Sequence, residues 1–182
     1  MTTAPPSEVI ERVTSYIQHN AAKDAPALRE LVQAGHERLA GLLDNVSEEQ
    51  ARFKPAPDTW CVLELLHHVA SAKGGVARIC ERLARGETVP GAGREGDEQD
   101  GIVRGEPFAS LAEARAAMEA AHRELVSFVD GPLTTANTEA RFNHFLFGDL
   151  NCREWTAFQR VHDGDHAAQI EQIKSAAGFP AA

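Results

Sequence analysis

Apolar side chains recur at three- and four-residue steps along four long segments of the chain, which is the period of an amphipathic α-helix. We expect these helices over residues 26–45, 60–86, 110–129 and 152–177, with a shorter helix over residues 8–19 before them. No stretch alternates apolar and polar positions for long enough to indicate a strand. The pattern therefore predicts an all-α fold, a four-helix bundle with an extra short N-terminal helix.

The segments between the helices set the domain organisation. By its length the chain, residues 1–182, is a single domain, with a polar tail over residues 1–6 and a bundle core over residues 26–177. Residues 87–107 are rich in glycine and acidic groups and have no hydrophobic period, so we expect a mobile surface loop there. The aromatic-rich connector over residues 131–151 has room for an extended piece, but we expect it to be too short for a sheet.

The last helix carries polar side chains in the middle of its apolar stripe. A buried Leu or Ile is worth roughly 1.5–3 kcal/mol, so polar residues at adjacent inner positions require a reason. Histidines at i and i+4 can direct two imidazoles at one metal ion. The inward positions of this helix are Trp155, Phe158, His162, His166, Gln169 and Ile173.

The helix over residues 60–86 supplies a third imidazole. At about 100° per residue, His68 lies on the shoulder of the apolar stripe, whereas His67 faces nearly the opposite side. If the two helices are neighbours, His68, His162 and His166 converge on one point. Three neutral histidines with an open fourth position are typical of a catalytic or ligand-accepting metal centre. Zn, Ni, Co and Fe all accept imidazole ligands, and the sequence does not choose among them.

Other polar residues near these histidines are candidates for a supporting role. A metal-bound histidine usually donates its other N–H to an acceptor, which makes nearby acids candidates to orient the rings. The alternative for each acid is a solvated helix charge, and for a core histidine a hydrogen-bonded place in the packing. The candidate acids are Asp163, Glu64 and Asp165, and the candidates to line the pocket are Gln169, His144 and His122.

Charge and composition exclude several classes of function. The chain has 27 acidic and 18 basic residues and a formal net charge of −9, which argues against a nucleic-acid partner. It contains neither a membrane-spanning apolar run nor a signal-peptide pattern. Cys61, Cys80 and Cys152 are widely spaced and form no CxxC pair, so we expect packed thiols in a reducing cytoplasm.

Two motifs resemble those of the DinB/YfiT-like superfamily. TWCVLELLHHVA, at residues 59–70, resembles the W-S-x-x-E-x-x-x-H-[LV] motif of its second helix. FNHFLFGDLNCREWTAFQRVHDGDHAAQI, at residues 142–170, resembles its H-x-x-x-G-x-L-x-x-x-E-W…H-x-x-x-H-x-x-Q-I ending. The resemblance implies an up-down-down-up four-helix bundle, often dimeric, that binds a metal through His68, His162 and His166.

Two positions depart from the motifs of that family. Cys61 stands where the family usually has serine, so the Ser-x-x-Glu capping box that Glu64 would complete is expected to be degraded. Phe145 stands where a proline often follows the connector histidine, His144. Neither departure touches an expected metal ligand.

The resemblance also implies a class of activity. Relatives include transferases and isomerases that use bacillithiol, mycothiol or glutathione. We therefore expect a cytoplasmic metal-dependent enzyme, most simply a thiol S-transferase acting on small electrophilic substrates. Its cofactor would be a divalent transition metal (Zn, Ni or Fe), and a low-molecular-weight thiol would be the co-substrate. The alternatives are a metal-dependent hydrolase using the same site, and a non-catalytic metal- or ligand-binding stress protein. Its partner would be a small molecule rather than nucleic acid or membrane, and a homodimer is allowed.

Overall fold

The computed structural model describes residues 5–90 and 107–181. Most of the predicted loop over residues 87–107, and the first residues of the predicted tail, lie outside the described residues. None of the described helices combines the length and the apolar character needed to cross a bilayer. The α-helices of the described chain are α1 (Ser7–Ala21), α2 (Ala25–Gly41), α3 (Glu48–Arg52), α4 (Val62–Ala84), α5 (Leu111–Asp130) and α6 (Cys152–Ser175), with a 3-10 turn η1 (Pro132–Thr135) after α5.

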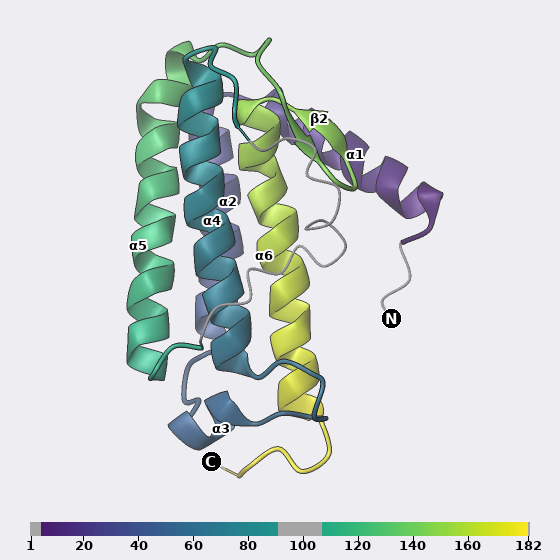
Figure 1. Cartoon of the computed structure of the whole chain (residues 1–182), viewed down its shortest axis with the longest axis vertical. Coiled ribbons are helices and arrows are strands. Elements are labelled where there is room, and N and C mark those ends of the chain that lie inside the picture. The colour runs from purple at the N-terminus through teal and green to yellow at the C-terminus, as the bar shows by residue number, and fades with distance from the viewer. Residues whose placement is uncertain (1–4, 91–106, 182) are drawn as a thin grey trace.

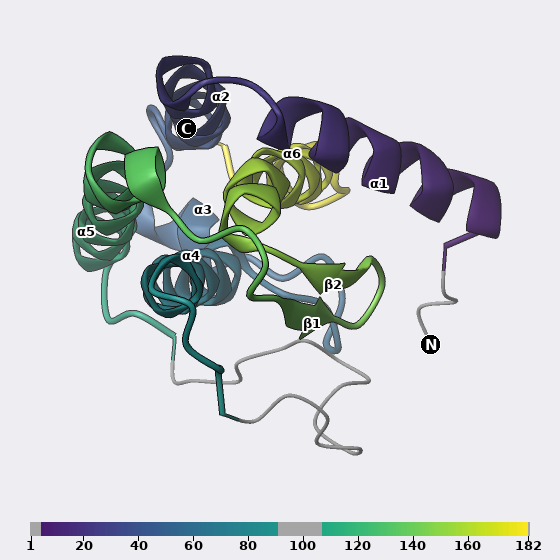
Figure 2. The ribbon, with the colours of Figure 1, turned by 90° about the horizontal axis from the view of Figure 1, so that it is seen from above.

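Helices α2, α4, α5 and α6 form a four-helix bundle. Seen from above, they occupy the corners of a square, and α1 lies outside it against α6 (Figures 1 and 2). α4 and α5 run in the same direction, and α2 and α6 run in the opposite one (Figure 1). This is the up-down-down-up arrangement, so the predicted all-α bundle with an extra N-terminal helix is confirmed. Parallel neighbours such as α4 and α5 require a long connection, which residues 85–110 supply.

The predicted helix ends are shifted by a few residues, each for a local reason. The helix expected over residues 26–45 corresponds to α2, which ends at Gly41. A turn follows in which Asn45 has a φ of 60°. The apolar period continues through this turn because Leu43 is buried there. The helix expected over residues 8–19 begins one residue earlier, since α1 starts at Ser7 and Pro6 occupies the N-cap position.

The aromatic connector forms a small hairpin, so the expectation that it is too short for a sheet is wrong. β1 (Phe142–His144) pairs with β2 (Gly148–Leu150) in an antiparallel register. Gly148 has a φ of 71°, the left-handed conformation that ends a three-residue hairpin loop. The Nδ1 atom of His144 accepts hydrogen bonds from the N–H groups of Leu146 at 3.1 Å and Phe147 at 3.4 Å. These side-chain contacts stabilise the turn, and they cannot be recognised from an alternation of apolar and polar residues along the sequence.

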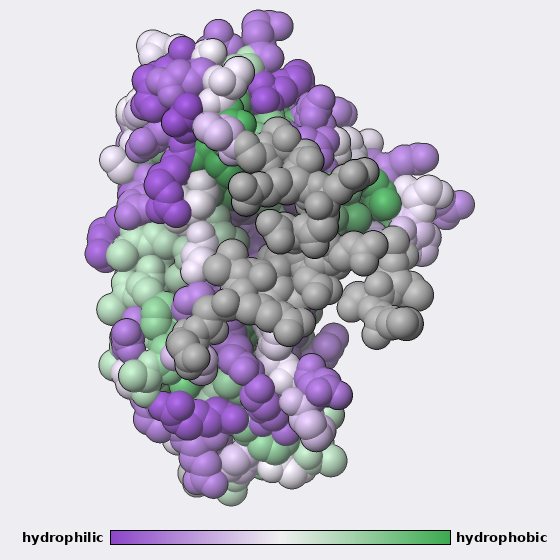
Figure 3. Space-filling model, in the orientation of Figure 1, coloured by the Kyte–Doolittle hydropathy of each residue, from purple (hydrophilic) through white to green (hydrophobic). Residues whose placement is uncertain are grey.

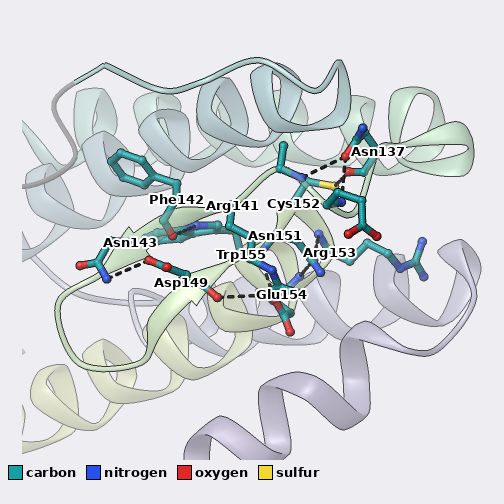
Figure 4. A network of polar contacts seen from close by, with 12 residues as sticks. Asn137, Arg141, Phe142, Asn143, Asp149, Asn151, Cys152, Arg153, Glu154 and Trp155 are labelled. Atoms are coloured by element: carbon teal, nitrogen blue, oxygen red, sulfur yellow. Dashed lines mark hydrogen bonds and ion pairs between the residues drawn. The ribbon is translucent and has the colours of Figure 1, made fainter.

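A network of hydrogen bonds fixes the hairpin to the first turn of α6 (Figure 4). Asn151 caps the helix, and its N–H donates to the Glu154 carboxylate at 2.9 Å, which completes a capping box. Arg141 donates to the same carboxylate at 3.0 Å, and the indole N–H of Trp155 donates to the carbonyl of Phe142 at 3.2 Å. The hairpin and the start of α6 are therefore one rigid unit.

Replacing this cap should weaken the whole protein. We expect Asn151→Ala to lower the free energy of unfolding by about 1–2 kcal/mol, because two helix N–H groups lose their acceptor. Asn143→Ala is the matched control, since Asn143 is exposed on the hairpin and its amide donates to the exposed side chain of Asp149. Urea unfolding measures both, and equal midpoints for the two variants would contradict the capping role.

The core consists of two larger apolar clusters with a polar layer between them. One cluster joins the start of α4 to the end of α6, and the other joins the end of α4 to the start of α6. Between them every bundle helix contributes a buried polar side chain. The buried residues of this polar layer are His36 of α2, Lys73 of α4, His122 of α5, and Gln159, Asp163 and His166 of α6.

The surface seen in Figure 3 is mostly hydrophilic. A weakly hydrophobic area lies on its left side, over α5 (Figures 1 and 3). The sequence of α5 is rich in alanine, and Ala112 and Ala116 are exposed on it. The large hydrophobic side chains exposed in the described chain include Phe145, which is 58% exposed at the tip of the hairpin, and Tyr16, which is 40% exposed on α1.

Candidate metal centre

Three imidazoles from two helices converge on one point inside the bundle. The Nε2 atom of His162 lies 3.2 Å from Nε2 of His68 and 3.1 Å from Nε2 of His166. All three ligand atoms lie within 4.8 Å of one another. Two imidazole nitrogens that bind one metal at about 2.1 Å are separated by about 3.0–3.4 Å, which matches these distances. The predicted convergence is therefore observed, with His68 and His166 buried and His162 half-buried.

Helix geometry explains why this set of histidines meets. His162 and His166 lie one turn apart on α6 and face α4, which packs against it. His68 lies on the side of α4 that faces α6, with the indole of Trp60 5.3 Å from its ring. His67, one residue earlier, is turned toward Phe108, whose ring lies 5.3 Å away. The adjacent pair is thus divided as the 100° step predicts.

Burial favours the neutral form of all three imidazoles. The pKa of His68 is lowered from 6.5 to about 4, mainly by burial and then by the nearby His166 and His67. Burial, followed by the charges of His166 and His68, holds the pKa of His162 well below its ordinary value. Burial also lowers the pKa of His166. A metal binds only the neutral imidazole, so at neutral pH no proton has to leave these rings before metal binding.

Gln169 orients one of the three rings. Its Oε1 atom lies 3.2 Å from Nδ1 of His166, and its amide N–H donates to Asp165 at 3.1 Å. Because the amide N–H of Gln169 donates to Asp165, the amide oxygen is turned toward the ring and accepts a hydrogen bond from the Nδ1–H of His166. The Nε2 lone pair of His166 is then directed at the other histidines. Gln169, predicted to line the pocket, thus contacts a candidate ligand, as its three-residue spacing from His166 could have indicated.

Glu64 does not orient His68, so that prediction is wrong. Its carboxylate accepts a hydrogen bond from the N–H of Cys61 at 2.9 Å and forms an ion pair with Lys54 at 2.7 Å. Nδ1 of His68 has no hydrogen-bond partner among the described residues. Glu64 lies in the first turn of α4, where the unpaired N–H groups of the helix compete for its oxygens. The half of the capping box that depends on Glu64 is therefore intact, although Cys61 replaces the usual serine.

Asp163 is a buried counter-ion and not a partner of a metal ligand, contrary to expectation. It is fully buried, and its carboxylate lies 2.7 Å from the ammonium group of Lys73, which is 2% exposed. Gly35 of α2 makes room for it, since a Cβ atom at this position would lie 3.1 Å from the carboxylate. Lys73 was missed because a lysine within an apolar stripe is ordinarily assigned to solvent.

His122 belongs to a different cluster, so the prediction that it lines the metal pocket is wrong. Its ring stacks on His36 with centroids 4.0 Å apart and planes inclined by 3°. Nε2 of His122 lies 2.8 Å from the amide oxygen of Gln33, and Nε2 of His36 lies 2.8 Å from the carboxylate of Glu119. The pair connects α2 to α5, and the alternative interpretation of a hydrogen-bonded core histidine applies to His122.

His144 lies one aromatic ring away from the triad. Its ring centroid is 4.5 Å from that of Phe158, and Phe158 is 5.7 Å from His162. Its Nδ1 atom is used by the hairpin turn, and burial lowers its pKa to about 4. The ring of Phe158 thus contacts both His144 and His162. The expected role of His144 in lining the pocket stays a prediction.

Comparisons with known proteins place the chain in a family. A sequence model of the DinB superfamily matches residues 31–170, most of the chain. The chain belongs to the DinB superfamily. All three converging histidines lie in the matched residues. A search of curated proteins gave no match.

The likeness to a solved structure agrees with the bundle. The protein is similar to the structure described as "Crystal structure of TT2238, a four-helix bundle protein", with a TM-score of 0.58 and 20% sequence identity. The similarity covers 81% of this chain and 98% of that chain. At this identity it supports the fold alone.

The residues of this DinB site fit a divalent transition metal. The donor set is three neutral imidazole nitrogens at suitable separations, and Gln169 fixes the direction of one of them. Among the described residues the cluster contains no fourth histidine, cysteine or carboxylate. A metal held by these rings would therefore retain a position for a non-protein ligand. Zn, Ni and Fe all suit such a donor set.

Acidification should destabilise this DinB protein in its metal-free form. Burial is the main cause that lowers the pKa of His122 and of His144 from 6.5 to about 4. The folded protein keeps both rings neutral, whereas the unfolded chain binds protons at them below pH 6.5. Their contribution to stability is therefore complete above pH 6.5 and is lost as the pH falls toward 4. From these pKa values, each ring accounts for a loss of about 2 kcal/mol at pH 5.

Urea unfolding at pH 7 and pH 5, with a chelator present, measures this loss. His122→Phe should reduce the difference between the two pH values, because it removes one of the buried rings that must be protonated. His19→Gln is the control, since His19 is exposed on α1, and it should keep the wild-type difference. Equal stability of the wild type at the two pH values would show that these rings titrate alike in both states.

Proposed function

We propose that this protein is a metal-dependent enzyme that joins a low-molecular-weight thiol to small electrophilic substrates. The observation that carries the proposal is the convergence of three neutral Nε2 atoms without a fourth protein ligand in the cluster, among the described residues. Structural metal sites use four protein ligands, whereas sites that act on a bound molecule leave a position open. An open site in a bundle interior favours small ligands.

The chain's own residues prepare the site for this chemistry. Bound there, a divalent metal would lower the pKa of a thiol at the open position, so that its thiolate forms near neutral pH. The histidines stay neutral because they are buried, and Gln169 keeps the Nε2 atom of His166 directed inward. Trp60 and Phe158 pack beside His68 and His162 and provide apolar surface that excludes water from the nucleophile.

The acids near the triad favour a thiol over a water as the nucleophile. Hydrolysis commonly uses a positioned general base to take a proton from water. All three candidate acids have other partners. Glu64 pairs with Lys54 and accepts from the N–H of Cys61, Asp163 pairs with Lys73, and Asp165 accepts from Gln169. A thiol has a far lower pKa than water and does not need such a base. The hydrolase alternative is therefore the second choice.

A conjugation assay tests the proposal. The protein is purified without a histidine tag, its metal content is measured, and it is assayed with glutathione, bacillithiol and mycothiol against chromogenic electrophiles. We expect turnover that requires a thiol, is lost with a chelator and returns with one metal. Metal-dependent hydrolysis without a thiol would support the hydrolase instead, and metal binding without turnover would support a binding protein. Full activity after chelation would overturn the metal-dependent mechanism altogether.

A further inference from the structure

Gln159 is a buried amide with no described partner. It lies on α6 and is fully buried, and neither its Oε1 nor its Nε2 atom has a hydrogen-bond partner among the described residues. Buried amides are nearly always hydrogen-bonded, because an unpaired one loses its hydration without compensation. An apolar residue of the same size would avoid that cost. The presence of Gln159 in the polar layer therefore requires a partner beyond the contacts of the described residues.

His162 has a complementary unpaired atom one turn away. Its Nε2 faces the other two imidazoles, and its Nδ1 has no hydrogen-bond partner among the described residues. Residues three apart on a helix are neighbours, with Cβ atoms about 5–6 Å apart, so Gln159 and His162 lie next to each other. On the other side of the pair of ligands, Gln169 is also three residues from its histidine and contacts Nδ1 of His166.

The sequence of α6 therefore has a symmetrical spacing, Q-x-x-H-x-x-x-H-x-x-Q, over residues 159–169. In one half of it the amide is seen to hold the ring. In the other half the amide and the ring nitrogen are both buried, and neither has a partner in the part of the chain that the structure describes. A metal on Nε2 requires the proton to sit on Nδ1, and this proton needs an acceptor.

We propose that Gln159 is the positioning residue of His162. Its amide oxygen accepts the Nδ1–H of His162, directly after rotation of the side chain or through one buried water, and this holds the ring in the direction the metal requires. The inference rests on the proposed metal centre and extends it to a residue outside the ligand set. A neutral amide suits this place, because a second carboxylate beside the buried Asp163 would lack a cation of its own.

The first test compares zinc affinity and stability in the Gln159→Leu variant. Loss of an outer partner typically weakens metal binding by about 10–100-fold, which calorimetric titration of the metal-free protein with zinc measures. The thermal midpoint of the metal-free variant should be equal to that of the wild type or higher, because an unpaired amide has been replaced by an apolar group. A merely structural glutamine gives the opposite pair of results, with a lower midpoint and unchanged affinity, and that would overturn the proposal.

Two further variants keep this comparison decisive. Gln169→Leu is the matched control, because the amide of Gln169 contacts His166 in the structure. This variant should weaken zinc binding to a similar extent. Gln159→Met serves if the branched side chain of leucine prevents folding, because it is unbranched like glutamine and lacks the amide. Zinc affinity of Gln159→Met equal to that of the wild type would count against the proposal as strongly as the same result for Gln159→Leu.

A measurement without metal separates this inference from the proposed function. In ¹⁵N-histidine-labelled, metal-free protein, Gln159→Leu should shift the Nδ1 resonance of His162 and leave that of His166 in place, while Gln169→Leu should do the reverse. An unchanged His162 resonance would overturn the pairing whatever the metal affinity. If the wild type binds no zinc, cobalt, nickel or iron, the proposed function fails, and the resonances still decide whether Gln159 holds His162.

Discussion

The Lys73→Met variant is expected to be less stable than the wild type by about 3–5 kcal/mol. Lys73 and Asp163 are almost completely buried, at 2% and 0% side-chain exposure, and their charged atoms lie 2.7 Å apart. Removing the ammonium group leaves a carboxylate in the core without a cation. One oxygen of that carboxylate already lacks a described partner, so nothing in its fixed surroundings replaces the lost contact. Urea unfolding at pH 7 measures the difference.

Removing both members of the pair should restore most of this loss. In Lys73→Met/Asp163→Leu neither charge of the pair remains, and apolar replacements of buried ion pairs are often neutral or stabilising. Arg29→Met is the control for loss of an ion pair as such, because Arg29 and Asp130 are each 51% exposed, and we expect it to cost less than about 1 kcal/mol. A double variant as unstable as Lys73→Met would mean that the packing of the lysine stem, and not its charge, was responsible.

The position of this pair connects stability to the candidate metal centre. Lys73 belongs to α4 and Asp163 to α6, which are also the two helices that carry the histidines. A short ion pair in the core is sensitive to small displacements, so it fixes the register of one helix against the other. This ion pair of the polar layer therefore stabilises the packing of α4 against α6, whereas Gln169 contacts an imidazole of the triad directly.

The sequence predicts the histidine triad well because helix geometry is nearly rigid within one element. The 100° step places His162 and His166 on one face and separates His68 from His67, and the structure agrees on each point. The remaining assumption was that α4 and α6 are neighbours, which four long helices in a single bundle make reasonable. The fold and the convergence of the three histidines are thus consequences of periodicity.

The contacts of the acids near the triad are less predictable, because their hydrogen-bond and ion-pair partners lie on other elements. Glu64 pairs with Lys54 from the preceding loop, and Asp163 pairs with Lys73 from another helix. Neither partner can be identified from the periodicity of a single helix. The hairpin was missed for a similar reason, since its turn depends on the ring of His144 and on the positive φ of Gly148.

His162→Ala is expected to weaken metal binding by about 100- to 1,000-fold. Structural zinc sites with four ligands bind with about 10–16 kcal/mol, so that a single ligand accounts for about 2.5–4 kcal/mol. His162 is the central member of the triad, since its Nε2 atom contacts those of both His68 and His166. The two remaining rings would hold an ion with half of its positions open. Competition with a chelator of known affinity measures the change.

His67→Ala is the matched control for His162→Ala. It removes an imidazole that adjoins the site in sequence but faces Phe108, so zinc affinity should stay within about twofold of the wild type. Both variants remove a side chain that is only half-buried, and both should remain folded. Equal affinities of the two variants would show that the metal is held elsewhere, because the geometry of the triad requires them to differ. Zinc bound to His162→Ala as tightly as to the wild type would exclude His162 as a ligand.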